Sequence, residues 1–421
     1  MSFCTVSEHG KHLTDKPVHH SIWSSFLRAA RQGCLYVEII GLTLMEKVLL
    51  KNIDLPDSHR IDTYIRSGGY RALSKVLSEY TPEEVIDLVK RSGLRGRGGA
   101  GFPAGVKWIF MPKGFERPKY LICNADESEP GTFKDRVILE RDPHQLLEGI
   151  AIASYAMGVR HAYLYLRGEF PFGARRCREA VVEAQARDFL GEDILGKGFD
   201  LDIHVHLGAG AYICGEETAL MESLEGKRGW PRIRPPFPAA QGLFGCPTTI
   251  NNVETLCNVP HIIERGVEWY TGIGPEKNHG PKLYGVSGPV VRPGVYELPM
   301  SVTLPELLYD HAGGLLEGCR LKGVIPGGSS TPILTPEEIE VGMNFDALQK
   351  AGSMLGSAGV IVLDHTICIV RSTLVLNRFY AHESCGQCTP CREGTGWLEL
   401  VLERLEHGEG EEGDVDLLIE I

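Results

Sequence analysis

The chain has 421 residues, of which 43% are hydrophobic and 23% are charged. This composition is that of an ordinary globular protein, and it excludes a disordered tail, a collagen-like chain and a coiled-coil rod. The formal net charge of −12 argues against generic nucleic-acid binding, because phosphate backbones attract basic surfaces. The most apolar stretch, residues 35–50, is interrupted by Glu38, Glu46 and Lys47, so we expect no membrane-spanning helix. The first residues also lack a secretory-signal pattern, which predicts a chain that stays in the cytosol or faces it.

Residues 1–45 fit poorly with the rest of the chain, because they are rich in histidine and show neither a helical nor a strand period. We interpret them as an atypical N-terminal extension and hypothesise that they lie upstream of a true start at Met45. The pattern sharpens at residues 81–84, where Thr81 is a potential N-cap, Pro82 suits the first turn and Glu84 completes a capping box. We therefore predict a helix from Thr81 to about Gly93.

Short apolar runs follow at the spacing typical of α/β proteins. Residues 120–123, 162–166 and 201–207 are predicted strands, and residues 146–155 and 175–186 are predicted helices between them. Strands that alternate with helices of this length predict a doubly wound, largely parallel sheet. We assign this α/β domain to residues 46–273, with a proline-rich surface loop at 231–238.

The pattern changes after about residue 274. Residues 282–298 are typical of a β-hairpin and residues 304–311 of a short helix, so we assign a small α+β domain to residues 274–365. The remainder, residues 366–421, is predicted to be helical and carries three closely spaced cysteines near its start.

A glycine-rich loop follows the first predicted helix. Gly96, Gly98 and Gly101 satisfy G-x-G-x-x-G, but a helix precedes the loop where the dinucleotide fingerprint requires a strand. The glycines still allow close approach of the backbone to a flat or phosphorylated ligand. The alternative is a flexible linker next to core aromatic residues. The side chains that suit a phosphate or a stacked ring are Arg95, Arg97, Lys107, Phe102, Trp108 and Phe110.

Two further segments follow predicted strands and are rich in acidic residues. Residues 124–136 come directly after the strand at 120–123, at the edge where open α/β sheets bind ligands. Residues 208–220 form a glycine turn and the start of a helix, where Glu216 and Glu217 suit the hydroxyl groups of a ribitol or ribose. The alternatives are a solvated turn for the first segment and acidic residues that complement the helix dipole for the second.

Cys385, Cys388 and Cys391 have the C-x-x-C-x-x-C spacing of bacterial-type iron–sulfur sites. Structural zinc is the competing metal, but it usually requires a second Cys-x-x-Cys pair or histidines. Incidental spacing is the remaining alternative. We interpret most of the other nine cysteines as small buried hydrophobic residues: Cys4, Cys34, Cys123, Cys177, Cys214, Cys246, Cys257, Cys319 and Cys368.

Five motifs, taken together, resemble the NADH-binding flavoprotein subunit of respiratory complex I, a family of about 51 kDa chains. They are RGRGGAGFP at 95–103, NADESEPGTFKDR at 124–136, GAYICGEETAL at 210–220, NNVETL at 251–256 and ESCGQCTPCR at 383–392. The resemblance runs from about Met45 to the C-terminal end. It implies a Rossmann-like FMN and NADH domain, a small ubiquitin-like, soluble-ligand-binding β-grasp domain and a helical iron–sulfur domain.

The resemblance also implies the activity of an NADH:quinone oxidoreductase in a proton-translocating complex. Hydride would pass from NADH to FMN by ring stacking, and single electrons would then pass to a [4Fe–4S] cluster and on to quinone through partner subunits. No nucleophile or general base is implied, and Glu129 is the candidate for positioning the nicotinamide. The implied FMN contacts are Gly96, Arg97, Gly98, Lys107, Asn124, Asp126, Glu127, Ser128, Tyr212, Gly215, Glu216, Asn251, Asn252 and Thr255.

The implied NADH contacts are Phe102, Phe110, Glu129, Glu217 and Phe237. Arg234 stands where some relatives have lysine, which keeps the charge but alters the contact.

The implied cluster ligands are Cys385, Cys388 and Cys391, and the fourth ligand is absent from this chain. The family places it roughly 40 residues beyond the third, so we expect a C-terminally truncated chain that holds its cluster poorly. His382 is the substitute that would otherwise be needed.

The implied partners are a small thioredoxin-like 2Fe–2S subunit and a larger iron–sulfur subunit. The implied location is a peripheral arm on the cytoplasmic or matrix side of the membrane, with no direct insertion and no nucleic acid. Two other functions stay open. One is the diaphorase subunit of an NAD-linked hydrogenase or formate dehydrogenase, and the other is a non-catalytic assembly scaffold.

Overall fold

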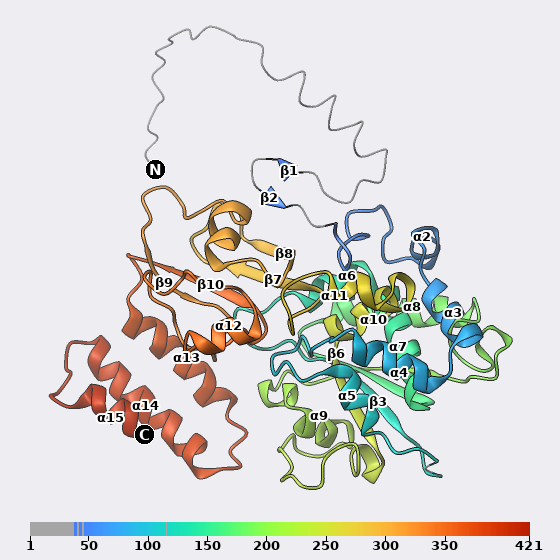
Figure 1. Ribbon diagram of the computed structural model, residues 1–421. Helices are drawn as coiled ribbons and strands as arrows, with labels where there is room; N and C mark the ends of the chain where they lie inside the picture. The colour runs from blue at the N-terminus through green and yellow to red at the C-terminus, as the bar shows by residue number, and fades with distance from the viewer. Residues whose placement is uncertain (1–37, 40–41, 44–45, 115) are drawn as a thin grey trace, which may run out of the picture. The chain divides into compact units, whose positions relative to one another are not determined.

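The computed structural model describes residues 38–39, 42–43, 46–114 and 116–421 (Figure 1). The chain divides into two units, Met1–Glu46 and Lys47–Ile421. In the first unit, strands β1 (Glu38–Ile39) and β2 (Leu42–Thr43) pair antiparallel. The predicted N-terminal extension and the start at Met45 otherwise lie outside the described residues. All that follows concerns the second unit.

A four-stranded parallel sheet forms the centre of the α/β part of the chain. Its strands are β3 (Tyr120–Ala125), β4 (His161–Leu166), β5 (Asp202–Leu207) and β6 (Thr248–Asn252), in the order β5-β4-β3-β6. The predictions at 120–123, 162–166 and 201–207 are confirmed, as is the parallel arrangement. Strand β6 was not predicted, because its sequence Thr-Thr-Ile-Asn-Asn is too polar to stand out as an apolar run.

Helices cover both faces of this sheet. One face packs on a large core that includes Leu121 and Cys123 of β3 and the almost wholly buried helix α7. The other face contributes Ile122, Tyr165 and Ile250 to a smaller core under α9. The helices of this part are α2 (Ile61–Arg66), α3 (Arg71–Glu79), α4 (Pro82–Arg91), α5 (Ala104–Ile109), α6 (Asp135–Arg141), α7 (Pro143–Met157), α8 (Pro171–Gln185), α9 (Glu217–Leu224), α10 (Val253–Arg265) and α11 (Val267–Thr271), with short 3₁₀ turns η1 (Ile194–Gly196), η2 (Tyr212–Gly215) and η3 (Leu243–Gly245).

Helix α4 begins as its sequence predicts. The Thr81 hydroxyl accepts a hydrogen bond from the Glu84 backbone N–H, and the Glu84 carboxylate accepts one from the Thr81 backbone N–H at 2.7 Å. This capping box satisfies N–H groups that the first helical turn leaves free. Helix α4 then buries Val85 and Val89 and leads directly into the glycine loop, so that a helix and not a strand precedes that loop.

A second, mixed sheet has a core of its own. Its strands are β7 (Pro281–Ser287), β8 (Gly294–Pro299), β9 (Leu321–Ile325) and β10 (Gly359–Asp364), in the order β8-β7-β10-β9. Strands β7 and β8 form the predicted antiparallel hairpin, and β7 and β10 are parallel. The predicted short helix is η4 (Glu306–His311), a π-helical turn, and α12 (Phe345–Lys350) packs on the same core.

The C-terminal part is helical, as predicted. It consists of α13 (Ile369–Glu383), α14 (Thr389–Glu406) and α15 (Asp414–Glu420), and the three cysteines lie at the turn between α13 and α14. Figure 1 shows these helices in red next to strands β9 and β10 in orange. Among the described residues, no helix has the length and apolar character needed to cross a bilayer.

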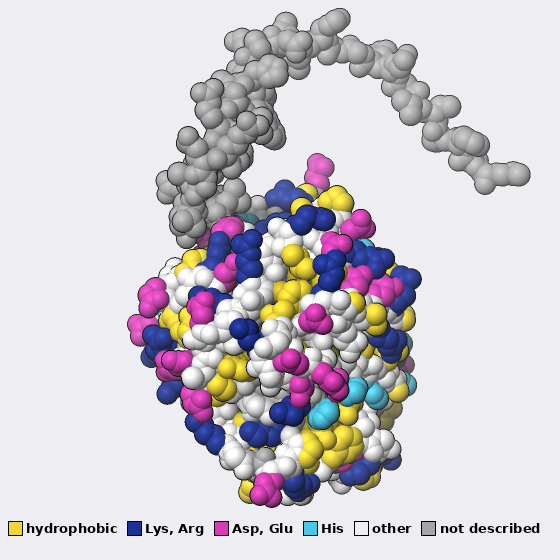
Figure 2. Space-filling view, turned by 90° about the vertical axis from the view of Figure 1, so that its right-hand side faces the viewer, with side chains coloured by type: hydrophobic (Ala, Val, Ile, Leu, Met, Phe, Trp, Pro, Cys, Tyr) yellow, Lys and Arg dark blue, Asp and Glu magenta, His cyan; other side chains and the backbone are white. Residues whose placement is uncertain are grey.

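The surface carries mixed charge. On the face shown in Figure 2, lysine and arginine side chains are interspersed with aspartate and glutamate, and no broad basic area appears on that face. This distribution agrees with the net charge of −12 and with the expectation that the chain does not bind nucleic acid through its backbone phosphates.

Candidate functional site

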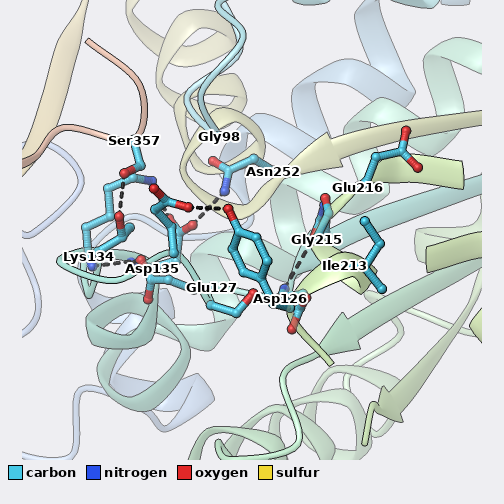
Figure 3. Close-up of a pocket in the computed structure, with 15 residues that line it drawn as sticks. Gly98, Asp126, Glu127, Lys134, Asp135, Ile213, Gly215, Glu216, Asn252 and Ser357 are labelled. Carbon is cyan, nitrogen blue, oxygen red and sulfur yellow. Dashed lines mark hydrogen bonds and ion pairs between the residues drawn. The ribbon is translucent and has the colours of Figure 1, made fainter. Parts of the chain in front are cut away.

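A polar cavity of about 350 Å³ opens at the carboxyl edge of the parallel sheet (Figure 3). The glycine loop, the segments that follow β3, β5 and β6, and the turn before β10 all contribute to its wall. Lys134, Asp135 and Ser357 lie toward one end, and Ile213 and Glu216 toward the other. The lining residues are Gly98, Asn124, Asp126, Glu127, Ser128, Glu129, Thr132, Lys134, Asp135, Tyr212, Ile213, Gly215, Glu216, Asn252 and Ser357.

The glycine loop presents bare backbone to this cavity. A Cβ atom on Gly98 would lie 3.0 Å from the Cβ of Asn252, so the position has no room for a side chain without a shift of β6. Gly101 has a φ of +64°, and a Cβ there would meet the Phe345 ring at 2.7 Å. The Gly96 backbone N–H donates to the Phe102 carbonyl at 2.8 Å and closes the loop. The loop therefore places its backbone against the polar end of β6, as a cofactor cradle requires.

Arg97 does not present its charge to the cavity. Its guanidinium is buried and donates to the Tyr270 hydroxyl at 3.1 Å and to the His279 carbonyl at 2.7 Å. Its backbone N–H donates to the Thr255 hydroxyl at 2.8 Å. The interpretation of the Arg97 side chain as a cation for phosphate is therefore wrong, because the core beneath the loop takes up its charge.

The interpretation of Trp108 as a stacking ring is also wrong. Trp108 is buried, and its indole N–H donates to the Asn251 side chain at 2.9 Å, so both residues support the site from below. Phe102, Phe110 and Phe237, by contrast, are 48%, 58% and 61% exposed. Their rings are accessible to a ligand that extends beyond the cavity.

The segment after β3 divides its polar groups between the cavity and the fold. The Asn124 amide donates to the Gly215 carbonyl at 2.8 Å and so joins the ends of β3 and η2. The Glu127 carboxylate accepts hydrogen bonds from the backbone N–H groups of Lys134, Asp135 and Arg136, which lie at the start of α6. Glu127 therefore satisfies a helix N-terminus, and burial raises its pKa to about 7.

Asp126 keeps its carboxylate at the cavity wall. Burial raises its pKa to about 7, although the Ser128 hydroxyl, which donates to it at 3.3 Å, and Arg167 both oppose the shift. A carboxyl group with such a pKa is partly protonated near neutral pH, so it can either donate or accept a hydrogen bond toward a bound ring.

Lys134 and Asp135 are cavity residues that the sequence analysis did not select. The Lys134 ammonium contacts the Asp135 carboxylate at 2.8 Å and the Glu254 carboxylate at 2.6 Å. Burial opposes its charge, but these carboxylates outweigh burial and raise the pKa of Lys134. Asp135 in turn accepts from the Asn252 amide at 2.6 Å. The signal was their position inside the motif at 124–136, where adjacent opposite charges look like an exposed pair.

Glu216 and Glu217 are already engaged by the protein. Glu216 is the N-cap of α9 and accepts from the Thr218 and Ala219 backbone N–H groups, which confirms the helix-start alternative for this residue. Glu217 accepts from Lys107 at 2.8 Å, and Arg234 reaches Glu216 at 3.3 Å and Glu217 at 3.0 Å. This ion-pair group lies at the rim of the site, and Glu216 also lines the cavity wall.

The structure thus brings most of the predicted cofactor residues into one place. Gly98, Asn124, the residues from Asp126 to Glu129, Tyr212, Gly215, Glu216 and Asn252 line a single cavity. Gly96, Arg97, Lys107, Asn251 and Thr255 are not among its lining residues, and their contact with a cofactor stays a prediction. Bare backbone, a cavity within the usual size of ligand sites and a set of hydrogen-bonding side chains fit a flavin mononucleotide.

The three cysteines lie on an accessible turn. Cys385 is half-buried, Cys388 and Cys391 are exposed, and none of them forms a disulfide. Within the described part of the chain, no three His, Cys, Asp or Glu side chains are gathered closely enough to hold a metal ion. Three free thiols at this spacing nevertheless fit the chemistry of an iron–sulfur cluster.

The other cysteines divide by burial. The buried ones agree with the prediction: Cys123, Cys177, Cys214, Cys246 and Cys257. Cys319 is half-buried and Cys368 is exposed, so the prediction does not hold for them. Cys4 and Cys34 lie outside the described residues.

The fold and site define a class of protein: a flavin- and nucleotide-binding α/β chain with a distal iron–sulfur segment. Comparison with protein families agrees. Residues 89–261 match the Nuo51 FMN-binding domain, residues 282–362 the SLBB domain, and residues 371–421 the NADH-ubiquinone oxidoreductase-F iron-sulfur binding region. These stretches fall inside the three predicted domains, whose boundaries at 273 and 365 stay predictions.

Curated relatives cover most of the chain. The second F-type chain of the NADH-quinone oxidoreductase of Rhizobium meliloti (strain 1021) is 59% identical over 375 residues, which are 89% of each chain. The F-type chain of the NADH-quinone oxidoreductase of Mycobacterium tuberculosis (strain ATCC 25618 / H37Rv) is 53% identical over 386 residues, 90% of this chain and 86% of the relative. The chain belongs to this family, the F-type chains of NADH-quinone oxidoreductase.

A solved structure with a similar fold is that of an NAD+-reducing [NiFe]-hydrogenase in the H2-reduced state. It is 38% identical with a TM-score of 0.77, and the match covers 89% of this chain. The chain spans 60% of the length of that hydrogenase chain.

Proposed function

We propose that this chain is the electron-input subunit of an NADH–quinone oxidoreductase. It would bind FMN in the cavity at the carboxyl edge of the parallel sheet, accept hydride from NADH there and pass electrons on through an iron–sulfur cluster held by Cys385, Cys388 and Cys391. The observation that carries the proposal is the single cavity lined by Gly98, the segment after β3 and the turn at 212–216. These motifs meet there although more than 100 residues separate the first from the last in the sequence.

The chain's own residues act by binding and orientation. Bound FMN supplies a hydride acceptor that can release electrons singly, and the protein needs to hold two flat rings in contact. Gly98 and Asn252 leave room for a ring against the backbone, while Asn124 and Asp126 offer hydrogen bonds along its edge. Because fixed orientation alone can lower a barrier by about 7–11 kcal/mol in well-aligned systems, no nucleophile–base pair is required.

The rim residues extend the site for the nucleotide. Phe102, Phe110 and Phe237 provide exposed rings, and Glu217 with Lys107 provides polar groups. Glu129 lines the cavity and is the residue that we assign to positioning the nicotinamide. These assignments are supported by the positions of the side chains and by the family motif.

We further propose that the chain works in a peripheral arm, next to a small thioredoxin-like 2Fe–2S subunit and a larger iron–sulfur subunit. The names of the relatives support this arrangement, because each describes one subunit of a larger oxidoreductase. The cytoplasmic or matrix side is the side on which NADH is available.

Reduction of the bound flavin by NADH tests the proposed function. The full chain, loaded with FMN, should lose its visible flavin absorbance when NADH is added anaerobically, and this loss should occur at one flavin per chain. A colourless chain that fails to bind FMN, or a flavin that NADH does not bleach, would favour the assembly scaffold and contradict the proposal.

A diaphorase subunit of an NAD-linked hydrogenase is the second candidate. The structural match to the NAD+-reducing [NiFe]-hydrogenase, with 38% identity over 89% of this chain, supports it. The same electron-input chemistry would serve both hosts, so bleaching by NADH does not separate them. Purification of the native complex does, because the diaphorase would carry a hydrogenase and the complex I chain would carry membrane-arm proteins.

A further inference from the structure

The last turn of helix α13 contacts the rim of the cavity. The Glu383 carboxylate accepts a hydrogen bond from the Tyr212 backbone N–H at 2.9 Å. The Tyr212 ring meets the rings of Phe379 and Tyr380 edge-on, with centroids 5.3 and 5.9 Å apart. Tyr212 is thus held at its backbone and at its ring by the helix that ends just before Cys385.

The Tyr212 hydroxyl is held from the other side. It donates to the Glu129 carboxylate at 2.5 Å, and burial together with Glu129 raises the pKa of Tyr212, so the hydroxyl keeps its proton. The other Glu129 oxygen accepts from the Ser330 backbone N–H at 2.7 Å and from the Ser329 hydroxyl at 3.3 Å. Glu129 is therefore fixed by the turn at 328–330, which follows strand β9 of the second sheet.

Tyr380 completes this chain of hydrogen bonds. Its hydroxyl lies 2.6 Å from the Ser329 hydroxyl oxygen. A serine hydroxyl has one proton, and Ser329 gives that proton to Glu129, so Tyr380 is the donor to Ser329. The network runs from Tyr380 through Ser329 to Glu129, which also accepts from Tyr212, and hydrogen bonds linked in this way polarise one another.

The backbone of the turn is shaped for this contact. Gly328 has a φ of +99°, and a Cβ atom there would lie 2.7 Å from the Cγ of Glu129. Only glycine allows the turn to approach the carboxylate this closely. Glu129, Tyr212, Ser329 and Tyr380 are all partly buried, which strengthens their hydrogen bonds relative to bonds in open water.

We propose that Ser329 and Tyr380 are positioning residues for NADH, and that they act by holding the Glu129 carboxylate and the Tyr212 hydroxyl in place at the rim. The inference rests on the proposed function, since it assigns the nucleotide to that site. It means that the SLBB-type sheet and the iron–sulfur helices each contribute a side chain to the geometry of the nucleotide site, although neither side chain lines the cavity.

Two substitutions that each remove one hydroxyl test this inference. Tyr380→Phe and Ser329→Ala should each raise the KM for NADH about 3-fold to 10-fold, which is the effect of one lost hydrogen bond. The assay is oxidation of NADH by ferricyanide with the full FMN-loaded chain. We expect kcat to stay within about 2-fold, and FMN content and thermal midpoint to match the unaltered chain.

Matched controls come from the same two parts of the chain. Tyr309→Phe removes the hydroxyl of an exposed ring near the second sheet, and Ser372→Ala removes a hydroxyl that donates to the Cys368 carbonyl within α13. Neither hydroxyl belongs to the network at Glu129, so both variants should keep the KM of the unaltered chain.

A rescue and a double variant separate positioning from a general structural effect. Ser329→Thr keeps the hydroxyl and should restore the KM, whereas a role in packing alone would not follow the hydroxyl. The Ser329→Ala/Tyr380→Phe double variant should have a KM no higher than the worse single variant, because both belong to one chain of hydrogen bonds.

Three outcomes would overturn the inference: an unchanged KM in Ser329→Ala, equal losses in Ser329→Thr and Ser329→Ala, or fully additive effects in the double variant. If Tyr380→Phe fails to fold, the serine series decides alone. Failure of the proposed function is distinguishable, because the unaltered chain would then not be bleached by NADH at all.

Discussion

Glu254 joins the two sheets through buried charges, and its replacement by glutamine is the sharpest test of how the site is supported. The Glu254 side chain on α10 is fully buried and contacts the ammonium groups of Lys134 at 2.6 Å and Lys282 at 2.8 Å. Its second oxygen accepts from the Leu283 backbone N–H at 2.9 Å. Burial opposes its charge, but the two lysines lower the pKa of Glu254 to about 2, so it is ionised at neutral pH.

The size of the effect follows from these contacts. Glu254→Gln leaves two buried ammonium groups facing a neutral amide, and removal of one partner of a buried ion pair costs about 3–5 kcal/mol. Burial and the neighbouring Lys134 already lower the pKa of Lys282 to about 7, so Lys282 is the group that loses its proton in the variant. Because Lys134 also lines the cavity, FMN should bind more weakly as well.

Urea unfolding at pH 7, followed by far-UV circular dichroism, measures the loss. We expect Glu254→Gln to lower the free energy of unfolding by about 3–5 kcal/mol, and Glu254→Gln/Lys282→Met to recover about half, because the second change removes an unpaired cation. Glu264→Gln, at an exposed position of the same helix, should stay within about 0.5 kcal/mol. A loss below about 1 kcal/mol in Glu254→Gln would refute the argument that these charges hold the two sheets together.

Three further predictions concern the site itself. Phe102→Ala should raise the KM for NADH about 2-fold to 10-fold while FMN stays bound, because an exposed ring contributes stacking only; equal loss of FMN, or an equal effect of the exposed Phe172→Ala, would show that the ring is misassigned. The pKa of Asp126 is about 7 in the folded chain against 3.8 unfolded, so the folded state binds its proton more tightly and loses stability as the pH rises through this window. Relative to Asp126→Asn, the unaltered FMN-free chain should lose about 2–3 kcal/mol of unfolding free energy between pH 5 and pH 8, and a pH-independent difference would contradict the burial of this carboxyl group. Cys388→Ser should lower the iron bound per chain after anaerobic reconstitution, whereas Cys368→Ser, at an exposed cysteine away from the motif, should not; equal iron in both variants would remove Cys388 from the cluster.

Local signals in the sequence predicted much of the fold. The capping box at Thr81 and the apolar runs of β3, β4 and β5 depend on neighbours a few residues away, and each appears in the structure where it was expected. Strand β6 escaped because its buried threonines and asparagines gain their partners from β3 and from the glycine loop, which are distant in sequence. Polar strands of this kind carry no periodic signal.

The sequence by itself determined which motifs belong together, the cysteine spacing and the alternation of strands and helices. The tertiary structure decided what each polar side chain does. Arg97 and Glu127 stand in glycine-rich and acidic motifs that suit a ligand, yet one is taken up by the core beneath the loop and the other by the start of α6. A charged side chain has the same local sequence whether a cofactor or a buried N–H group is its partner, and only long-range packing chooses between them. For the same reason, the support that Tyr380 gives to Glu129 could be found only in the folded chain.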